Sequence, residues 1–341
     1  MPTVKIQYNI SLKSYNTFGI DATANEFVEV ATIEELLLLV NTFNFSARKI
    51  LVLGGGSNLL LTKDFDGMII KNSIQGLELL NEDDESVWVK AMAGEKWHSF
   101  VMYCIEHGYG GVENLSLIPG CVGAAPMQNI GAYGVEIKDV FSSLEAVEIE
   151  TGNIVLFTNS DCKFGYRESV FKNELKGKYI IVSVVFRLSK HPKFNVTYGA
   201  IQQTLDKNEI KDITVKAISD AVIEIRTSKL PNPKILGNAG SFFKNPEIST
   251  LEFEELKVKF PNIVGYPTSN GNTKLAAGWL IEQCGWKGKQ VGNTGSHKDQ
   301  SLVLVNYGGA TGNEIWQLAM DIQQSVKDKF GVTITPEVNI V

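Results

Sequence analysis

The sequence has 341 residues, of which 44% are hydrophobic and 21% charged, a balance typical of a globular protein, and it carries a formal net charge of −6. This length exceeds one compact core and predicts two or three domains. The negative charge argues against a protein that binds nucleic acid or an anionic membrane surface. The longest apolar runs are far too short to span a bilayer, so we expect no membrane partner.

Cysteine and histidine spacing argues against a metal site. The four cysteines form no CxxC pair, so neither a zinc knuckle nor a redox dithiol is indicated. The four histidines show no HxxxH or HxH spacing. We expect no bound metal, free thiols in a reducing environment and a cytoplasmic protein. The cysteines lie at positions 104, 121, 162 and 284.

The first half of the chain predicts a mixture of helices and strands. Thr32 and Glu35 form a capping-box pattern at the start of TIEELLLLVNTF, which predicts a helix. Thr151-Gly152-Asn153 lies between two apolar segments and predicts an antiparallel hairpin. Further strands are expected at 49–53, 68–72, 86–94 and 179–188, and a further helix at 95–108.

The second half predicts more helix and a change of domain. Apolar residues of 213–226 share one helical face, and prolines and glycines then mark a boundary near 227–237. Thr311 and Glu314 are expected to cap a long helix. Helices are also expected at 249–260 and 274–285, and strands at 301–306 and 332–341. The last of these strands should return to the sheet of another domain, because a short terminal strand needs a partner.

The first glycine-rich segment, GGGSN at 54–58, follows a short apolar strand. Glycines allow backbone N–H groups to approach a phosphate without obstruction by Cβ. The segment lacks the GK[ST] of a P-loop and the third glycine of GxGxxG. A phosphate-binding loop and a plain glycine-rich turn both remain open here.

The second segment, IPGCVGAAPMQNIGAYG at 118–134, has little side-chain bulk over half its length. Two such loops in one half of the chain could hold the two ends of a pyrophosphate, as in a dinucleotide site outside the Rossmann class. The alternative is a long irregular connection, although ordered loops of this length are usually functional.

Three polar residues in distant segments are candidates for chemistry. Arg167 in FGYRES could bind a carboxylate through its guanidinium fork or simply pair with Glu168. Glu337 is the only acid in TITPEVNIV. It could transfer a proton, or it could be a charge that keeps an edge strand from pairing with other chains. Ser241 in GNAGSFFKNP is either a proton donor in a dry pocket or a turn residue over a hydrophobic floor. No histidine motif accompanies it, which argues against a GxSxG hydrolase.

These motifs occur in a specific order along nearly the whole chain. NTFGI, GGGSN, IPGCVGAAPMQNIGAYG, FGYRES, KLPNP, GNAGSFFKNP, KLAAGWLIEQCG and TPEV together closely resemble the UDP-N-acetylenolpyruvoylglucosamine reductases, flavin enzymes of peptidoglycan precursor synthesis. The resemblance implies an α+β fold, with an FAD-binding domain of the vanillyl-alcohol-oxidase type in two subdomains and an α+β substrate-binding domain. The boundaries expected are 1–72 with the strand 332–341, then 73–226, then 227–331.

The resemblance also implies the ligands and a reaction. NADPH would reduce non-covalently bound FAD, and the reduced flavin would pass hydride to UDP-N-acetylglucosamine enolpyruvate. Arg167 and Glu337 would stabilise the enol-type intermediate, because negative charge spreads into the substrate carboxylate. Ser241 would then protonate the α-carbon in a water-poor pocket. A monomer is expected.

The remaining positions that the resemblance implies concern binding. Tyr198 in VTYGAI resembles the tyrosine of a loop that closes over the substrate in the long form of the family, and Lys229, Asn245 and Gln300 match substrate-contacting positions. The positions implied for FAD are Gly54, Gly55, Gly56, Ser57, Asn58, Gly120, Gly123, Ala124, Ile130 and Gly131.

Two other functions stay open at this point. A flavin oxidase of the same fold could attach its flavin covalently, and Cys121 is the only candidate thiol in a flavin loop. A nucleotide-binding module without catalysis would not need Arg167, Ser241 and Glu337 together.

Overall fold

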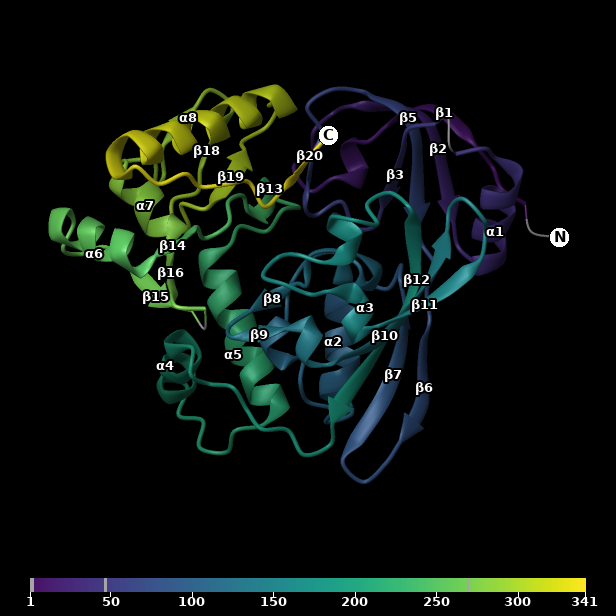
Figure 1. The fold of residues 1–341 in the computed structure, drawn as a ribbon, viewed down its shortest axis with the longest axis horizontal. Coiled ribbons are helices and arrows are strands. Elements are labelled where there is room, and N and C mark those ends of the chain that lie inside the picture. Colours follow the sequence, from purple (N-terminus) through teal and green to yellow (C-terminus); the bar gives the residue numbers. More distant parts are fainter. Residues whose placement is uncertain (1–2, 46–47, 269) are drawn as a thin grey trace. The chain divides into compact units, whose positions relative to one another are not determined.

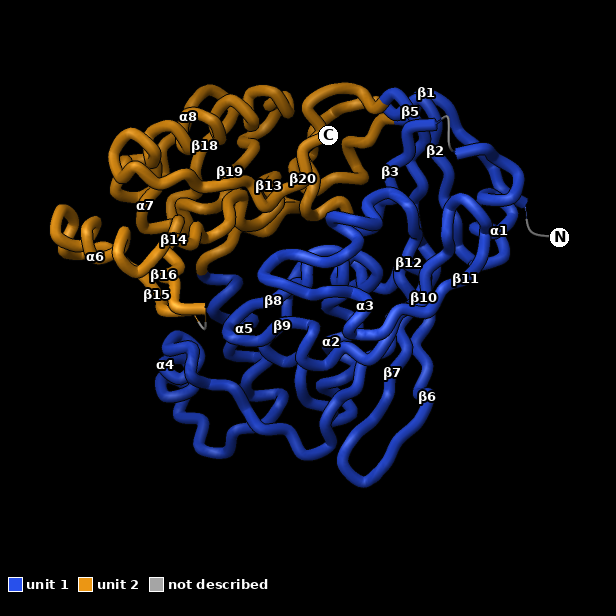
Figure 2. The backbone as a smooth tube through the Cα atoms, in the orientation of Figure 1, with its two compact units in different colours: residues 1–10, 24–55, 66–228 blue, residues 11–23, 56–65, 229–341 orange. Residues whose placement is uncertain are grey.

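The computed structural model describes residues 3–45, 48–268 and 270–341. The chain forms two compact units, each built from several stretches of sequence (Figure 2). The first comprises residues 1–10, 24–55 and 66–228, and the second comprises residues 11–23, 56–65 and 229–341. The three-part division drawn from the sequence stays a prediction.

The N-terminal part of the first unit is a four-stranded sheet with one helix (Figure 1). Thr32 begins the helix as predicted, because its hydroxyl accepts a hydrogen bond from the Glu35 N–H over 3.1 Å. Leu36 and Leu39 of this helix are buried against the sheet residues Val28 and Met68. The sheet order is β1 (Gln7–Ser11), β2 (Thr23–Val30), β5 (Phe65–Asn72) and β3 (Ile50–Leu53), and the helix is α1 (Ile33–Thr42).

A five-stranded antiparallel sheet forms the rest of the framework of the first unit. The apolar strand predicted at 179–188 lies at its centre, and most of its residues are buried. The predicted hairpin is present at one edge. The order is β11 (Ile154–Thr158), β10 (Phe141–Glu148), β12 (Tyr179–Ser189), β7 (Ser86–Met92) and β6 (Leu77–Glu82).

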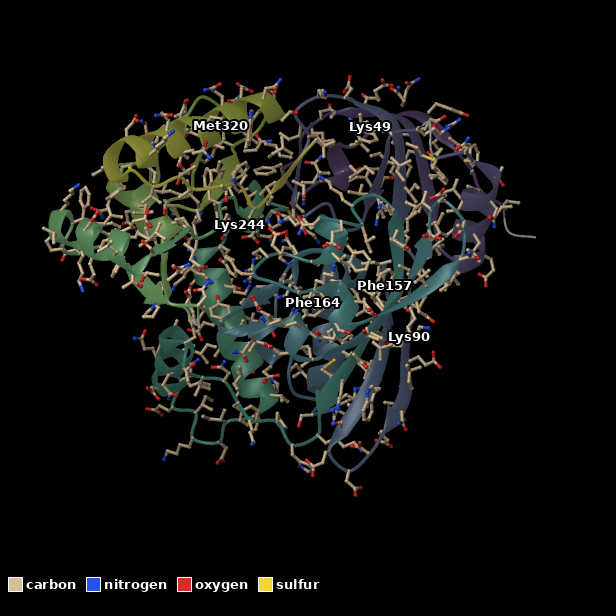
Figure 3. All side chains as sticks on the ribbon, in the orientation of Figure 1. Lys49, Lys90, Phe157, Phe164, Lys244 and Met320 are labelled. Atoms are coloured by element: carbon tan, nitrogen blue, oxygen red, sulfur yellow. The ribbon has the colours of Figure 1, made fainter. Side chains whose placement is uncertain are left out.

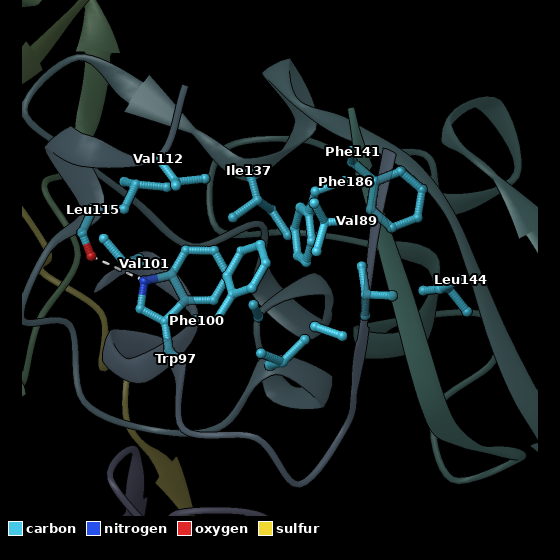
Figure 4. Close-up of a cluster of buried hydrophobic side chains, with 14 of the residues drawn as sticks. Val89, Trp97, Phe100, Val101, Val112, Leu115, Ile137, Phe141, Leu144 and Phe186 are labelled. Carbon is cyan, nitrogen blue, oxygen red and sulfur yellow. Dashed lines mark hydrogen bonds between the residues drawn. The ribbon is translucent and has the colours of Figure 1, made fainter. Parts of the chain in front are cut away.

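One hydrophobic core of the first unit packs the helix α2 (Trp97–Glu106) with residues of this sheet (Figure 4). Trp97 and Phe100 contact the ring of Phe186, with centroids 5.8 and 4.7 Å apart. The indole N–H of Trp97 donates to the carbonyl oxygen of Leu115 over 2.9 Å, so this buried polar group is satisfied. Phe157, labelled in Figure 3, adds an edge contact to Phe171 in the same core.

Two helices form a smaller core in the same unit. The predicted helix at 213–226 is α5 (Val215–Lys229), and its apolar face is buried as expected. It packs against α4 (Gly199–Lys207), a helix that the sequence analysis did not predict.

The described residues of the second unit include two antiparallel sheets and the helices α6 (Thr250–Lys259), α7 (Ala277–Gln283) and α8 (Gly312–Phe330). The capping box of Thr311 and Glu314 is present at the start of its longest helix, as predicted. One sheet has the order β13 (Gly237–Ser241), β19 (Val303–Asn306), β18 (Thr294–Ser296) and β17 (Gln290–Val291). The other has the order β14 (Glu247–Ser249), β16 (Asn272–Leu275) and β15 (Gly265–Pro267).

Two predicted elements of this unit need correction. The helix expected at 274–285 begins at Ala277, because the residues before it belong to strand β16. In that strand the buried Thr273 and Leu275 alternate with more exposed residues, as is typical of a strand. The strand expected at 332–341 is reduced to β20 (Asn339–Ile340), which pairs in parallel with β4 (Leu59–Leu60). Pro336 has no N–H for a continuous ladder, and the segment before β20 makes one isolated bridge instead.

Three further expectations concern membranes, metals and cysteines. Within 3–45, 48–268 and 270–341, no helix combines the length and apolarity that crossing a bilayer requires. The same ranges contain no group of three His, Cys, Asp or Glu side chains arranged to hold a metal ion. All four cysteines are free thiols, as predicted.

Candidate functional site

The two glycine-rich segments meet within the first unit. Strand β3 ends at Leu53, and a Cβ placed on Gly55 would lie only 2.9 Å from the Cα of Gly120. A Cβ on Gly54 would lie 3.4 Å from that of Cys121. Two backbones approach this closely only where side chains are absent. Gly55 is exposed, so the junction is open to a ligand.

The second segment is anchored to the sheet at Gly123. Its N–H donates to the carbonyl oxygen of Ala93 over 2.9 Å, and a Cβ on Gly123 would lie 2.5 Å from that of Ala93. The next residue, Ala124, is exposed, and Ile130 is half-buried. The segment therefore presents small, accessible residues from a fixed backbone.

Arg167 is held by that same segment. Its Nη2 donates to the carbonyl oxygen of Gly131 over 2.7 Å. Arg167 has a φ of +56°, a left-handed conformation that few non-glycine residues adopt, and it lies between the bridge partners Gly165 and Glu168. Its guanidinium carbon lies 5.5 Å from the centre of the Tyr166 ring. Such a conformation persists only where surrounding contacts impose it.

Two buried residues that the sequence analysis missed supply those contacts. The amide nitrogen of Asn129 donates to the carbonyl oxygen of Gly165 and to a carboxylate oxygen of Glu136, each over 3.0 Å. The hydroxyl of Ser169 donates to the carbonyl oxygen of Met127 over 2.7 Å. Alternate residues of one segment, 127, 129 and 131, are thus bonded to the turn 165–169. The one local signal was an asparagine between glycine-rich stretches, because asparagine tolerates the left-handed conformation that Asn129 adopts.

The segments of Ser241 and Glu337 lie side by side in the second unit. The Glu337 N–H donates to the carbonyl oxygen of Phe242 over 2.7 Å, and Phe243 forms a bridge with Pro336. Ser241 is exposed, whereas the two phenylalanines are 0% and 1% exposed. The structure therefore combines an accessible hydroxyl with a buried aromatic anchor, and both interpretations of Ser241, proton donor and turn residue, stay predictions.

Asn58, the last residue of GGGSN, also contacts the segment of Glu337. Its amide nitrogen donates to the carbonyl oxygen of Glu337 over 3.3 Å, and its own carbonyl oxygen accepts from the Asn339 N–H over 3.1 Å. Gly56, Ser57 and Asn58 belong to the second unit, in contrast to Gly54 and Gly55. Part of the predicted FAD motif is therefore bonded to the segment of a predicted catalytic residue.

Asn245 and Gln300 lie near the start of α7. The side-chain oxygen of Asn245 accepts from the Ala277 N–H over 3.0 Å. The side-chain oxygen of Gln300 accepts weakly from the Leu302 N–H over 3.4 Å and would lie 3.3 Å from a Cβ on Gly278. Each therefore has a structural contact in addition to its predicted contact with substrate.

Tyr198 and Lys229 are accessible. Tyr198 precedes α4, is 52% exposed and contacts the Tyr133 ring edge-on with centroids 5.3 Å apart. Lys229 is the last residue of α5 and is exposed. Arg167 and Tyr198 belong to the first unit, and Lys229, Ser241, Asn245, Gln300 and Glu337 to the second.

The Cys121 thiol is poorly suited to form a covalent bond. Burial raises the pKa of Cys121, and the charges of Lys71 and Lys96 oppose this only in part. A thiol, unlike a thiolate, is a weak nucleophile. The candidate for covalent flavin attachment is thus held in its unreactive form.

Two protein families match most of the chain between them. Residues 24–158 match the FAD binding domain family, and residues 232–341 match the C-terminal domain of UDP-N-acetylenolpyruvoylglucosamine reductase. These matches confirm the predicted α+β fold, with an FAD-binding domain of the vanillyl-alcohol-oxidase type and a second α+β domain.

Relatives named UDP-N-acetylenolpyruvoylglucosamine reductase match nearly the full length. The Flavobacterium johnsoniae protein is 52% identical over 99% of this chain and 100% of its own. The Amoebophilus asiaticus protein is 54% identical over 98% of this chain and 99% of its own. The Pseudomonas aeruginosa protein is 46% identical over 99% of both chains.

Solved structures agree at the level of the fold. The UDP-N-acetylenolpyruvylglucosamine reductase of Thermus caldophilus superposes with a TM-score of 0.70 at 23% identity, covering 99% of both chains. A solvent-stable cholesterol oxidase superposes with a TM-score of 0.50 at 12% identity, covering 98% of this chain and 87% of its own.

Proposed function

The chain belongs to the UDP-N-acetylenolpyruvoylglucosamine reductase family, and we propose on this premise that Arg167, Ser241 and Glu337 carry out its reaction. That reaction is the NADPH-dependent reduction of UDP-N-acetylglucosamine enolpyruvate to UDP-N-acetylmuramate, a step of peptidoglycan precursor synthesis. The enzyme is a flavoprotein that uses FAD. The observation that carries the site proposal is the bond from the Glu337 N–H to the Phe242 carbonyl, which holds the segment of the acid beside that of Ser241.

The glycine-rich segments suit a dinucleotide such as FAD. A Cβ at Gly55 would fill the close approach to Gly120, and the exposed Gly55 and Ala124 leave backbone accessible for phosphate oxygens. We assign FAD contacts to residues 54–58, Gly120, Gly123, Ala124, Ile130 and Gly131. Bound FAD supplies the hydride that reduces the substrate.

The protein's own side chains then stabilise the negative charge of the intermediate and supply the proton to the α-carbon. The Arg167 fork binds the substrate carboxylate and stabilises the negative charge that spreads into it from the α-carbon. Glu337 hydrogen-bonds the same enol-type group. The Ser241 hydroxyl donates the proton to the α-carbon, and the buried Phe242 and Phe243 limit water beneath it.

Four other residues are proposed to bind the UDP-sugar. Tyr198, exposed at the start of α4, closes over it. Lys229 supplies a positive charge, and Asn245 and Gln300 supply amide groups near the start of α7.

Three finer features complete the proposal. The flavin is non-covalent, because the raised pKa of Cys121 keeps its thiol unreactive. The protein is monomeric and cytoplasmic, which sedimentation and cell fractionation would test. Release of all yellow colour from acid-precipitated protein would support a non-covalent flavin, whereas colour retained in the pellet would contradict it.

The activity is tested by following NADPH oxidation spectrophotometrically with purified FAD-loaded protein. We expect rapid oxidation only when UDP-N-acetylglucosamine enolpyruvate is present, with UDP-N-acetylmuramate as the product. Equal oxidation without this substrate, or turnover of an alcohol instead, would favour a flavin oxidase of the same fold. The Arg167→Met variant should keep FAD and lose most of the turnover of the enolpyruvyl substrate.

A further inference from the structure

A buried guanidinium of the first unit has incomplete hydrogen bonding. Arg226 lies on α5, and its Nε is wholly buried without a hydrogen-bond partner among the described residues. The same guanidinium bonds to the hydroxyl of Tyr133. The residue as a whole is half-buried, so it is not sealed inside the core. A buried donor without an acceptor costs free energy and requires an explanation.

The charge of Arg226 also lacks an acidic partner within the described part of the chain. The hydrogen bond with the Tyr133 hydroxyl is its favourable contact there, and no carboxylate contributes. Arginine stays protonated at any physiological pH, so the fold holds a buried positive charge. Such a charge is strongly unfavourable unless something of opposite charge accompanies it.

Tyr133 is placed to share an anion with Arg226. Burial raises the pKa of its phenol, so the group is protonated at neutral pH. Because its oxygen accepts the hydrogen bond from Arg226, its own O–H can donate to a further acceptor. Tyr133 also has a φ of +50°, a strained conformation of the kind found at functional sites.

The neighbouring His98 does not provide the missing negative charge. Burial and the charge of Arg226 lower the pKa of His98, which is therefore neutral at pH 7. Its Nδ1 accepts the Leu117 N–H over 3.0 Å, so the ring proton is on Nε2. The cluster of Arg226, Tyr133 and His98 is thus cationic, and an anion has to come from a ligand.

We propose that Arg226 and Tyr133 form a binding site for a phosphate group of an exchangeable nucleotide, either the UDP-sugar or NADPH. A phosphate supplies the absent charge and accepts hydrogen bonds from both Nε–H and the phenol O–H. The Tyr198 ring packs on that of Tyr133 and is 52% exposed, so this aromatic pair extends to the protein surface. The inference deepens the proposed function, because it adds two residues to the binding of its nucleotides.

The test compares Arg226→Met, Arg226→Lys and Tyr133→Phe with the parent protein, all loaded with FAD. UDP and NADP⁺ serve as probes in calorimetric titrations, because each presents phosphate without turnover. We expect Arg226→Met to bind one of the two probes about ten- to a hundredfold more weakly, the usual effect of losing a charged hydrogen bond. The affinity of Arg226→Lys for this probe should lie between those of the parent and of Arg226→Met, because lysine keeps the charge and lacks the guanidinium fork. Tyr133→Phe should weaken the same probe.

Lys216→Met is the matched control, because it removes an exposed positive charge from the same helix. Equal weakening by this control would show a general effect of charge and overturn the proposal. So would parent-like binding of both probes to Arg226→Met, or loss of FAD from it, because FAD is not an exchangeable ligand.

Thermal unfolding without nucleotide separates binding from structure. Arg226→Met should have an unchanged or higher Tm than the parent, because it removes an uncompensated buried charge. A lower Tm would make Arg226 a structural residue and contradict the proposal. Failure of the proposed function itself would appear in the parent protein, which would then not oxidise NADPH with the enolpyruvyl substrate.

Discussion

Arg167 donates a hydrogen bond from Nη2 to the carbonyl oxygen of Gly131 over 2.7 Å. The side chain proposed to bind the substrate carboxylate is therefore held by a segment proposed to bind FAD. The buried side chains of Asn129 and Ser169 add two further hydrogen bonds between this segment and the turn that contains Arg167.

Asn129→Ala should displace Arg167 without removing it. The change leaves the carbonyl oxygen of Gly165 without its side-chain donor, and a lost buried bond of this kind costs about 1–3 kcal/mol. We expect UDP-N-acetylmuramate, which has a carboxylate, to bind about tenfold more weakly. UDP-N-acetylglucosamine, which has none, should bind as before. Calorimetric titration of both ligands measures the difference.

Asn159→Ala is the control for this comparison, because it removes an exposed amide that also bonds to backbone. It should change neither affinity. If Asn129→Ala weakened both ligands equally, Asn129 would support the fold and not the position of Arg167. Arg167→Met should itself abolish the preference for the carboxylate, and an unchanged preference there would contradict the role of the arginine instead.

Ser241→Ala should separate the two half-reactions. The variant should fold, bind FAD and accept hydride from NADPH at the parent rate, because none of these steps uses the Ser241 proton. Reoxidation of the reduced flavin by the enolpyruvyl substrate should slow by roughly 10²–10⁴-fold, as for loss of a general acid. Rapid-mixing absorbance of the flavin resolves both steps. Reoxidation at the parent rate would leave Ser241 as a turn residue over Phe242 and Phe243.

Gly237→Ala should destabilise the second unit more than Gly240→Ala. A Cβ on Gly237 would collide with the carbonyl oxygen of Phe18, a backbone atom that no side-chain rotation can move. We expect a loss of about 3 kcal/mol, at the upper end for overpacking. Gly240 has open space around it but a φ of +71°, so alanine there should cost about 1 kcal/mol. Denaturant unfolding of both variants gives the comparison, and equal losses would argue against the contact with Phe18.

Gly55→Ala should impair retention of FAD. Its Cβ would lie 2.9 Å from the Cα of Gly120 and force the two glycine-rich segments apart. We expect the purified protein to carry substantially less flavin, measured as the ratio of visible to ultraviolet absorbance. Gly199→Ala is the control, because Gly199 lies in the same unit with nothing within 4 Å of its Cβ position and without a left-handed φ. Full flavin content in Gly55→Ala would exclude this junction from the FAD site.

Tyr198→Phe should weaken use of the UDP-sugar and leave flavin reduction by NADPH nearly intact. The reason is that Tyr198 lies outside both glycine-rich segments and is exposed beside α4. Stopped-flow measurement of each half-reaction tests this expectation. Equal damage to both would point to a structural role, such as its ring contact with Tyr133.

The sequence by itself determined the elements whose causes are local. Thr32 with Glu35, and Thr311 with Glu314, place their helix starts because a cap and its partner lie within one turn. The buried strand β12 follows from an apolar run that is already visible in the sequence. The ordered motifs identified the family, because their combination is specific even though each glycine-rich segment alone left a turn as an alternative.

Only the tertiary structure decided which distant residues meet. Asn129 reaches Gly165 across 36 positions, and Ser169 reaches Met127 across 42, with no periodicity that could predict either contact. In the sequence, Arg226 looks like one more charged residue of a helix. It is unusual only because packing buries its Nε without a partner in the part of the chain that the structure describes. Local propensity acts through neighbours in the chain. Burial and hydrogen-bond satisfaction depend instead on segments that folding brings together.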